Sequence, residues 1–156
     1  MSKQTFYSNG KLLLTGEYLV IDGANALAIP TKKGQSLSIK GSEENKLNWK
    51  SFTYNNECWL EVSFSLPDLL IGKSSDSVKA KWLQNLLLSA KKINPTFLSD
   101  NIGIEATTTL DFPRNWGLGS SSTLINNVAQ WAQVDPFMLH FKVSNGSGYD
   151  IACAKE

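Results

Sequence analysis

The stretch that decides the fold of this chain reads Phe112-Pro113-Arg114-Asn115-Trp116-Gly117-Leu118-Gly119-Ser120-Ser121-Ser122. The residues after it are apolar at positions 124, 125, 128, 129 and 132, one face of a helical period, so a helix is predicted to begin at the serines. Residues 102–110, before it, alternate between apolar and polar in the manner of a strand with one buried face. A helix start presents unpaired N–H groups and partial positive charge, and glycines let a ligand come close to the backbone. The order strand, glycine turn, helix therefore predicts a phosphate-binding cradle.

The glycine turn has one competing interpretation, and spacing excludes two others. Gly-x-Gly followed by serines is also typical of an ordinary loop with a helix cap. A P-loop is excluded because it needs a lysine after its last glycine, and a hydrolase elbow is excluded because it needs Gly-x-Ser-x-Gly. The one histidine, His140, lies between Leu139 and Phe141 and is predicted to pack in a helix rather than to catalyse.

Length and composition indicate one globular domain. The chain has 156 residues, of which 42% are hydrophobic and 10% aromatic, enough for a core. Its net charge of +1 at pH 7 predicts neither nucleic-acid nor membrane binding. Cys58 and Cys153 lie far apart and in no metal-binding spacing, so reduced thiols in a cytoplasmic protein are expected. No apolar run approaches the roughly 18 residues of a membrane span.

Hydrophobic periodicity predicts the other elements of a single α+β domain over residues 1–156, without internal repeats. The predicted strands cover 12–14, 18–21, 24–29, 36–40, 46–54, 58–64 and 102–110, and the predicted helices cover 78–90, 120–132, 136–143 and the residues after 148. Pro30 and Gly34 are predicted to break the chain between strands, and Pro95 to end the first helix. Asp135 is predicted to cap the helix that begins at Pro136.

Three segments, in this order, resemble the signatures of one family. Pro113–Ser122, with its Gly-Leu-Gly-Ser-Ser core, resembles the second signature of the GHMP kinases, the family of galactokinase, homoserine kinase, mevalonate kinase and phosphomevalonate kinase. Asn9–Val20 resembles the first signature, in which Gly-Lys and Gly-Glu are spaced in this way. Gly146–Ala152 is similar to the Gly-Ser-Gly-x-Asp segment of phosphomevalonate kinases. Each segment is weak evidence alone, and together they are strong.

The resemblance implies both a fold and a function. The fold would be the GHMP kinase N-terminal domain, similar to ribosomal protein S5 domain 2, with a mainly antiparallel sheet backed by helices and with the C-terminal domain absent. The function would be ATP-dependent and Mg²⁺-dependent phosphorylation of a small-molecule hydroxyl or phosphate, in the mevalonate or phosphomevalonate branch. Two alternatives are a non-catalytic nucleotide-binding half-domain and an RNA-binding module. Two copies of the chain are predicted to pair as a homodimer over the surface that an absent domain would leave exposed.

The resemblance also implies a role for each candidate site residue. Asp150 would be the base that orients and deprotonates the acceptor hydroxyl, with Lys11 beside it, and Glu17 and Tyr18 would contact the substrate. The nucleotide would be bound by the turn and helix start, that is by Trp116, Gly117, Leu118, Gly119, Ser120, Ser121 and Ser122. Within that set the Ser121 hydroxyl would reach Mg²⁺, and Trp116 would line the adenine or ribose side.

Each of these residues also has an ordinary structural explanation, and the chain departs from the family pattern in places. An aspartate in the first turn of a helix is good helix chemistry, and a lysine ahead of three leucines is typical of a strand edge. Asn9 replaces the usual proline, and Tyr18 replaces the histidine of mevalonate kinases. Asp135 is the only carboxylate between the glycine turn and Asp150, so the sequence does not decide which carboxylate would complete a Mg²⁺ site.

Overall fold

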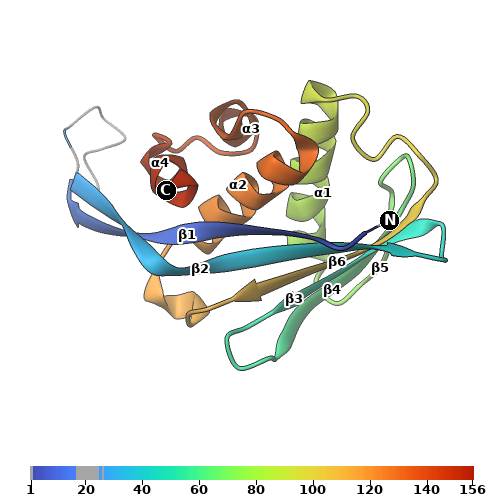
Figure 1. The fold of residues 1–156 in the computed structure, drawn as a ribbon, viewed down its shortest axis with the longest axis horizontal. Helices are drawn as coiled ribbons and strands as arrows, with labels where there is room; N and C mark the ends of the chain where they lie inside the picture. Colours follow the sequence, from blue (N-terminus) through green and yellow to red (C-terminus); the bar gives the residue numbers. More distant parts are fainter. Residues whose placement is uncertain (1, 17–24, 26) are drawn as a thin grey trace.

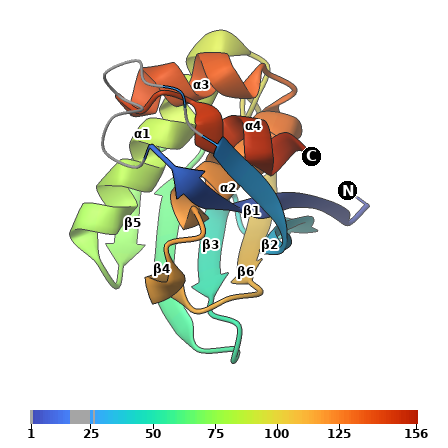
Figure 2. The same cartoon turned by 90° about the vertical axis from the view of Figure 1, so that its left-hand side faces the viewer.

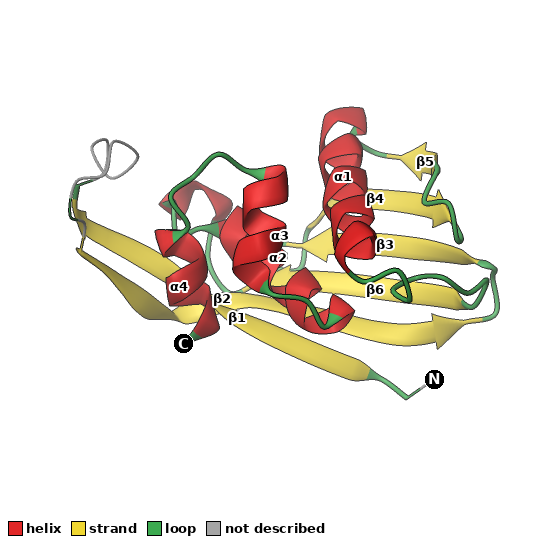
Figure 3. Ribbon diagram, turned by 90° about the horizontal axis from the view of Figure 1, so that it is seen from above, coloured by secondary structure: helices red, strands yellow, loops and turns green. Residues whose placement is uncertain are grey.

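The chain folds into two layers, a six-stranded sheet with its α-helices on one face (Figures 1 and 3). The structure is a computed structural model that describes residues 2–16, 25 and 27–156. Its elements are β1 (Gln4–Thr15), β2 (Leu27–Ser42), β3 (Lys46–Phe52), β4 (Cys58–Ser65), β5 (Ile71–Ser74), α1 (Ser77–Ile93), β6 (Gly103–Leu110), the 3₁₀ turn η1 (Arg114–Trp116), α2 (Ser120–Ala132), α3 (Pro136–Val143) and α4 (Tyr149–Lys155).

The sheet confirms the predicted fold class. Its strand order is β1-β2-β6-β3-β4-β5, and all neighbours are antiparallel except β3 and β6, which run parallel. The strands predicted over 46–54 and 58–64 are present as β3 and β4, and the helices predicted over 78–90, 120–132, 136–143 and after 148 are all present. The chain is therefore an α+β domain with a mainly antiparallel sheet.

The predicted breaks at Pro30 and Gly34 are wrong, because β2 continues through both residues. β6 pairs with β2 only from Gln35 onward, so Pro30 lies in a part of β2 that has β1 as its partner and tolerates a missing N–H. At Gly34 an added Cβ would collide with the carbonyl of Ser8, so glycine is needed for close strand contact and not for a turn. The predicted strand at 18–21 lies outside the described residues.

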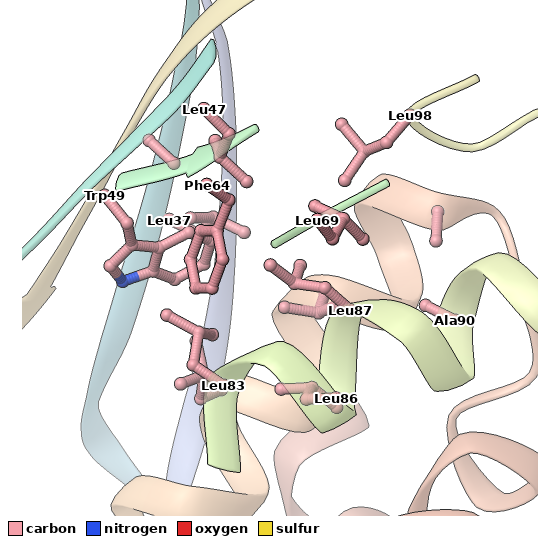
Figure 4. Packing of buried hydrophobic residues seen from close by; sticks show 14 of the residues in the cluster. Leu37, Leu47, Trp49, Phe64, Leu69, Leu83, Leu86, Leu87, Ala90 and Leu98 are labelled. Atoms are coloured by element: carbon pink, nitrogen blue, oxygen red, sulfur yellow. The ribbon is translucent and has the colours of Figure 1, made fainter. Parts of the chain in front are cut away.

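The core lies between the sheet and the helices (Figure 4). Leu83, Leu86 and Leu87 of α1 recur at helical spacing and are fully or almost fully buried. They pack against the inward faces of the central strands, from which Trp49 and Phe64 supply the largest side chains. The indole N–H of Trp49 has a hydrogen-bond partner in this apolar core, because it donates to Ser51 Oγ at 3.0 Å.

The opposite face of the sheet is polar and carries ion pairs between neighbouring strands. Lys40 pairs with Glu105 at 2.7 Å, and Lys50 pairs with Glu61 at 3.1 Å. Each of these side chains is at least 43% exposed, so the pairs add little stability. All buried packing of the sheet is therefore on the helical side, where the candidate site also lies.

Truncation of Leu86 tests this description of the core. Leu86 is 0% exposed, so Leu86→Ala is expected to lower the free energy of unfolding by about 2–5 kcal/mol through lost burial and an unfilled cavity. Chemical denaturation followed by circular dichroism measures the change. Val78 lies on the same helix but is 79% exposed, so Val78→Ala should stay within about 0.5 kcal/mol of the parent. Equal losses in the two variants would contradict the placement of α1.

Candidate active site

The glycine turn ahead of α2 has a conformation that favours glycine at two positions. Gly117 and Gly119 have left-handed backbone angles, with φ of 68° and 81°. A Cβ at Gly119 would also lie 2.7 Å from Ser122 Oγ and 3.1 Å from Lys11 Cγ. Gly119 caps α2 without any side-chain hydrogen bond, whereas Asp76 and Asp135 cap α1 and α3 with their carboxylates. The first backbone N–H groups of α2 are therefore left without a side-chain acceptor.

The three serines after the turn have different surroundings. Ser122 is buried, and its hydroxyl donates to the carbonyl of Gly119 at 2.9 Å. Ser121 is exposed and Ser120 half-buried, and both line a neighbouring cavity. Ser120 and Ser121 can therefore contact a ligand through their hydroxyls, whereas the Ser122 hydroxyl is used within the first turn.

The cavity beside the helix start has a volume of about 330 Å³ and lies between α1, α2, η1 and the ends of the central strands. Its walls include Trp59, Trp82, Leu83, Leu124, Lys79 and Arg114. The Arg114 guanidinium lies 4.0 Å from the centre of the Trp59 ring, a cation–π contact that fixes one wall. The arrangement offers aromatic faces and a cation next to the uncapped helix.

Sequence reasoning missed this aromatic wall. Ser51 pairs with Leu60 and Phe52 pairs with Cys58, which leaves Trp59 as the extra residue of a β-bulge. Strict alternation would have put Trp59 and Leu60 on opposite faces, yet both line the cavity. No pattern in the sequence marks that bulge. The predicted nucleotide residue Trp116 is 57% exposed and is not among the residues that line the cavity.

Backbone contacts bring the first and second signature segments together. The N–H of Lys11 donates to the carbonyl of Leu118 at 3.0 Å. A Cβ on Gly10 would lie 2.9 Å from the same carbonyl oxygen, so the glycine makes this approach possible. Both segments lie at the end of the sheet that faces the viewer in Figure 2, where the η1 segment is orange and the β1–β2 arm is blue.

The third segment meets Lys11 through side chains. Lys11 Nζ lies 3.8 Å from Asp150 Oδ1 and donates to the hydroxyl of Tyr149 at 3.1 Å. The side chains of Lys11 and Asp150 are 16% and 30% exposed. The structure thus places Lys11 close to both Gly119 and Asp150. Tyr149 was missed, although its place directly before Asp150 in the same helical turn was the available signal.

A change in strand register turns Lys11 toward α4. Ser8 of β1 is buried under the helices, and strict alternation from Ser8 would put Lys11 on the other face. The pairing of β1 with β2 shifts between Asn9 and Lys11, and the Lys11 side chain contacts Tyr149 and Asp150 of α4. A bulge of this kind re-aims a side chain. Sequence pattern alone therefore cannot place Lys11.

Two ionisable side chains beside Lys11 and Asp150, those of Tyr149 and Cys153, have raised pKa values. Burial raises the pKa of Tyr149, and the Lys11 ammonium lowers it in part. The charge of Asp150 and a hydrogen bond with its carboxylate raise the pKa further, so the phenol is neutral at neutral pH. Burial also raises the pKa of the Cys153 thiol, and the charge of Asp150 adds to that effect. Lys11 and Asp150 are therefore the charged pair of the site, and Tyr149 and Cys153 are neutral groups beside it.

The other predicted site residues lie elsewhere or outside the described part of the chain. Glu17 and Tyr18 are among the residues that the structure does not describe. Asp135 accepts from the N–H of Met138 at 2.8 Å and lies beyond the far end of α2, about 20 Å from Ser121. It therefore does not reach the serines. Among the described residues, no group of three or more His, Cys, Asp and Glu side chains could hold a metal ion.

A buried polar network holds the elements of the site together. Asn126 Nδ2 donates to Ser8 Oγ at 2.8 Å and to the carbonyl of Ala154 at 2.9 Å. Ser8 Oγ donates to Asn127 Oδ1 at 2.8 Å, and Asn127 Nδ2 donates to the carbonyl of Gln35 at 2.9 Å. These bonds connect α2 to β1, which carries Lys11, to β2, and to α4, which carries Asp150. The amphipathic pattern of α2 gave no sign that two asparagines would lie on its buried face.

Asn126→Ala tests the network. It leaves the Ser8 hydroxyl with one partner fewer and removes a bond to α4, so the free energy of unfolding should fall by about 1–3 kcal/mol. Urea denaturation measures the loss. Asn145 is exposed, so Asn145→Ala should change stability by less than about 0.5 kcal/mol. If the two variants are equally stable, the network does not contribute to stability, and the prediction is wrong.

The chain resembles known proteins in structure but not in sequence. No protein-family profile matches the chain, and no curated protein matches its sequence. No helix in the described part of the chain is long and apolar enough to cross a membrane.

Three solved structures are similar to the chain. Mevalonate kinase from Methanococcus jannaschii matches with a TM-score of 0.65 and 15% identity, over 91% of this chain and 47% of that one. Galactokinase from Lactococcus lactis, complexed with galactose, matches with a TM-score of 0.63 and 18% identity, over 96% and 38%. The Lin0012 protein from Listeria innocua matches with a TM-score of 0.68 and 21% identity, over 98% and 46%. The chain spans half or less of the length of these proteins, and its fold is that of the GHMP kinase N-terminal domain.

Proposed function

We propose that this chain binds Mg-ATP and takes part in phosphorylating a hydroxyl or phosphate group of a small molecule, in the manner of mevalonate and phosphomevalonate kinases. The observation that carries the proposal is the convergence of three separate segments. Lys11, the uncapped glycine turn at Gly119 and Asp150 lie together within a kinase-like fold. A fold match by itself would not support an activity, because one fold hosts many functions.

The nucleotide would be held at the start of α2 and in the adjoining cavity. The first N–H groups of α2 suit the phosphates, because they are not capped by a side chain and lie at the positive end of the helix dipole. The base would lie against Trp59 and Trp82 in the cavity. Ser121 would give a hydroxyl to Mg²⁺, whose other ligands would be phosphate oxygens and water, as is common for this ion. When bound, Mg-ATP supplies the phosphoryl group and neutralises its charge.

The acceptor would bind between Lys11 and Asp150. Asp150 Oδ1 is buried, and no hydrogen-bond donor from the described residues reaches it. A buried acceptor without a donor is costly, and a substrate hydroxyl would satisfy it. Asp150 would orient that hydroxyl and accept its proton, and the Lys11 ammonium would stabilise the negative charge on the oxygen. Glu17 and Tyr18 stay predicted substrate contacts.

A second candidate function is nucleotide binding without catalysis. The chain spans 47% of the mevalonate kinase and 38% of the galactokinase that it resembles. The RNA-binding alternative is disfavoured by the net charge of +1, because binding to a nucleic-acid backbone depends on a large excess of positive charge. A cytoplasmic location, where ATP is abundant, fits the free thiols Cys58 and Cys153. The homodimer stays a prediction, and Leu12, Leu14, Leu27 and Ile29 are the exposed apolar side chains that it would cover.

Nucleotide binding by the chain is the first test. Mg-ATP at about ten times its dissociation constant should raise the free energy of unfolding by about 1.4 kcal/mol, measured as a shift in Tm. Trp82→Ala removes an aromatic face of the cavity and should weaken ATP binding by about fivefold to 100-fold in calorimetry. Phe141 is exposed on α3, so Phe141→Ala serves as a control that binds normally. No Tm shift at saturating Mg-ATP would contradict the proposal, and Trp116→Ala in the same assay tests its predicted contact.

Asp150→Asn separates binding from chemistry. The amide keeps the shape of the side chain but cannot take a proton, so ATP affinity should stay within about threefold while transfer slows by about 100-fold or more. The measurement is ADP release with mevalonate, phosphomevalonate or galactose as acceptor. Wild-type rates in the variant would exclude Asp150 as the base. Nucleotide binding without transfer to any acceptor by the parent chain would favour the non-catalytic alternative.

A further inference from the structure

The hydroxyl oxygen of Ser51, near the end of β3, has two buried hydrogen-bond partners. It lies 3.0 Å from Trp49 Nε1 and 2.9 Å from Thr108 Oγ1. An indole N–H can only donate, so Trp49 occupies one lone pair of the Ser51 oxygen. Ser51 is 1% exposed and Thr108 is 0% exposed, so bulk water does not reach these hydroxyls. Their protons need acceptors inside the fold.

The direction of the bond between Ser51 and Thr108 follows from a count of protons. Among the described residues, the Thr108 hydroxyl has no hydrogen-bond partner except Ser51 Oγ. If Thr108 accepted this bond, its own proton would be buried without an acceptor, which is costly. Thr108 therefore donates, and both lone pairs of Ser51 Oγ are occupied. The proton of the Ser51 hydroxyl is left for a third group.

That third group is absent from the described part of the chain, and Ser51 lines the cavity beside the start of α2. A second donor in the wall of this cavity also lacks an acceptor. Trp59 Nε1 is buried and has no hydrogen-bond partner among the described residues. The walls around these donors are largely apolar and include Leu60, Trp82 and Leu83. Apolar walls with a few donors that lack acceptors suit a flat ring that carries acceptor atoms.

We propose that Ser51 is a specificity-determining residue whose hydroxyl donates a hydrogen bond to one ring nitrogen of the adenine base of ATP. This inference rests on the proposed nucleotide binding. The unprotonated ring nitrogens N1, N3 and N7 of adenine are hydrogen-bond acceptors. Ser51 pairs with Leu60 of the neighbouring strand, among apolar side chains that suit a base, whereas the phosphates would lie at Ser120 and Ser121 on the helix start.

Three analogues of ATP test this hydrogen bond without any change to the protein. In 1-deaza-ATP, 3-deaza-ATP and 7-deaza-ATP, one ring nitrogen is replaced by a C–H group. One of the three should bind about fivefold to 30-fold more weakly than ATP in calorimetry, because the Ser51 hydroxyl then faces a C–H group and loses its acceptor. The other two should bind within about threefold of ATP. Equal affinities for ATP and all three analogues would overturn the inference.

Variants of the protein show whether the weaker binding depends on Ser51. Ser51→Ala removes the donor, so this variant should bind ATP and the sensitive analogue with affinities within about twofold of each other. The substitution also removes the acceptor of Trp49 and Thr108. If Ser51→Ala does not fold, Ser51→Cys replaces it, because a thiol is a weak donor and should reduce the difference in the same direction. A difference that persists unchanged without the serine hydroxyl would contradict the role of Ser51.

Thr108→Val is the matched control. It removes the other hydroxyl of the pair, but Thr108 is not among the residues that line the cavity. This variant should be less stable than the parent and should still bind the sensitive analogue more weakly than ATP. If Thr108→Val abolishes the difference as Ser51→Ala does, the effect comes from disturbed packing and the inference is wrong.

Adenosine separates this inference from the proposed function, because it carries the base without the phosphates. If adenosine and its deaza analogues show the same difference while the chain releases no ADP with any acceptor, the role of Ser51 is supported and the kinase proposal alone fails. Phosphoryl transfer with equal affinities for ATP and all three analogues would leave the kinase proposal standing and overturn the role of Ser51. If neither ATP nor adenosine binds, both are wrong.

Discussion

The buried hydrogen bonds between the central helix and the first strand hold the candidate site in one arrangement. Asn126 and Asn127 are adjacent on α2, so their side chains leave the helix about 100° apart and reach different neighbours. Asn126 bonds to Ser8 and to α4, and Asn127 bonds to Ser8 and to β2. Because each of these buried groups would be costly if left unpaired, few other positions of β1 against α2 are acceptable. A slip of β1 by one residue would turn Ser8 away from α2 and break the network.

Glycine allows the site to be built partly from main chain. Gly10 lets β1 approach the carbonyl of Leu118, and Gly119 lets the start of α2 approach the side chain of Lys11. The N–H of Lys11 donates to the carbonyl of Leu118, and this hydrogen bond joins the strand directly to the glycine turn. The relative positions of the helix start and Lys11 are set by these backbone contacts. The Lys11 side chain only completes an arrangement that the backbone has already made.

One oxygen of the Asp150 carboxylate is buried without a hydrogen-bond donor among the described residues. A lysine and an aspartate that are both mostly buried would be expected to form a close pair. The attraction between the two charges is then strongest and best offsets the cost of removing them from water. In this chain Lys11 Nζ lies 3.8 Å from Asp150 Oδ1 and donates to the phenol oxygen of Tyr149 at 3.1 Å. Asp150 Oδ1 is therefore buried without a hydrogen-bond donor among the described residues, which lowers the stability of the folded state. Costs of this kind are typical of sites that wait for a ligand.

The sequence by itself determined the fold class and the approximate bounds of the helices and of β3, β4 and β6. It also named Lys11, Gly119 and Asp150 as site candidates, and these lie close together in the structure. Helical periodicity, the Asp135 cap and the glycine turn are local features, and these are present in the structure. The sequence did not show that β2 runs through Pro30, that Asn126 and Asn127 are buried, or that Trp59 lines a cavity. Those outcomes were decided by tertiary pairing. Bulges opposite Lys11 and at Trp59 change the face on which a side chain lies, and a bulge depends on how two distant strands align rather than on either strand alone. The sequence therefore names the residues of the site, and strand pairing determines where they point.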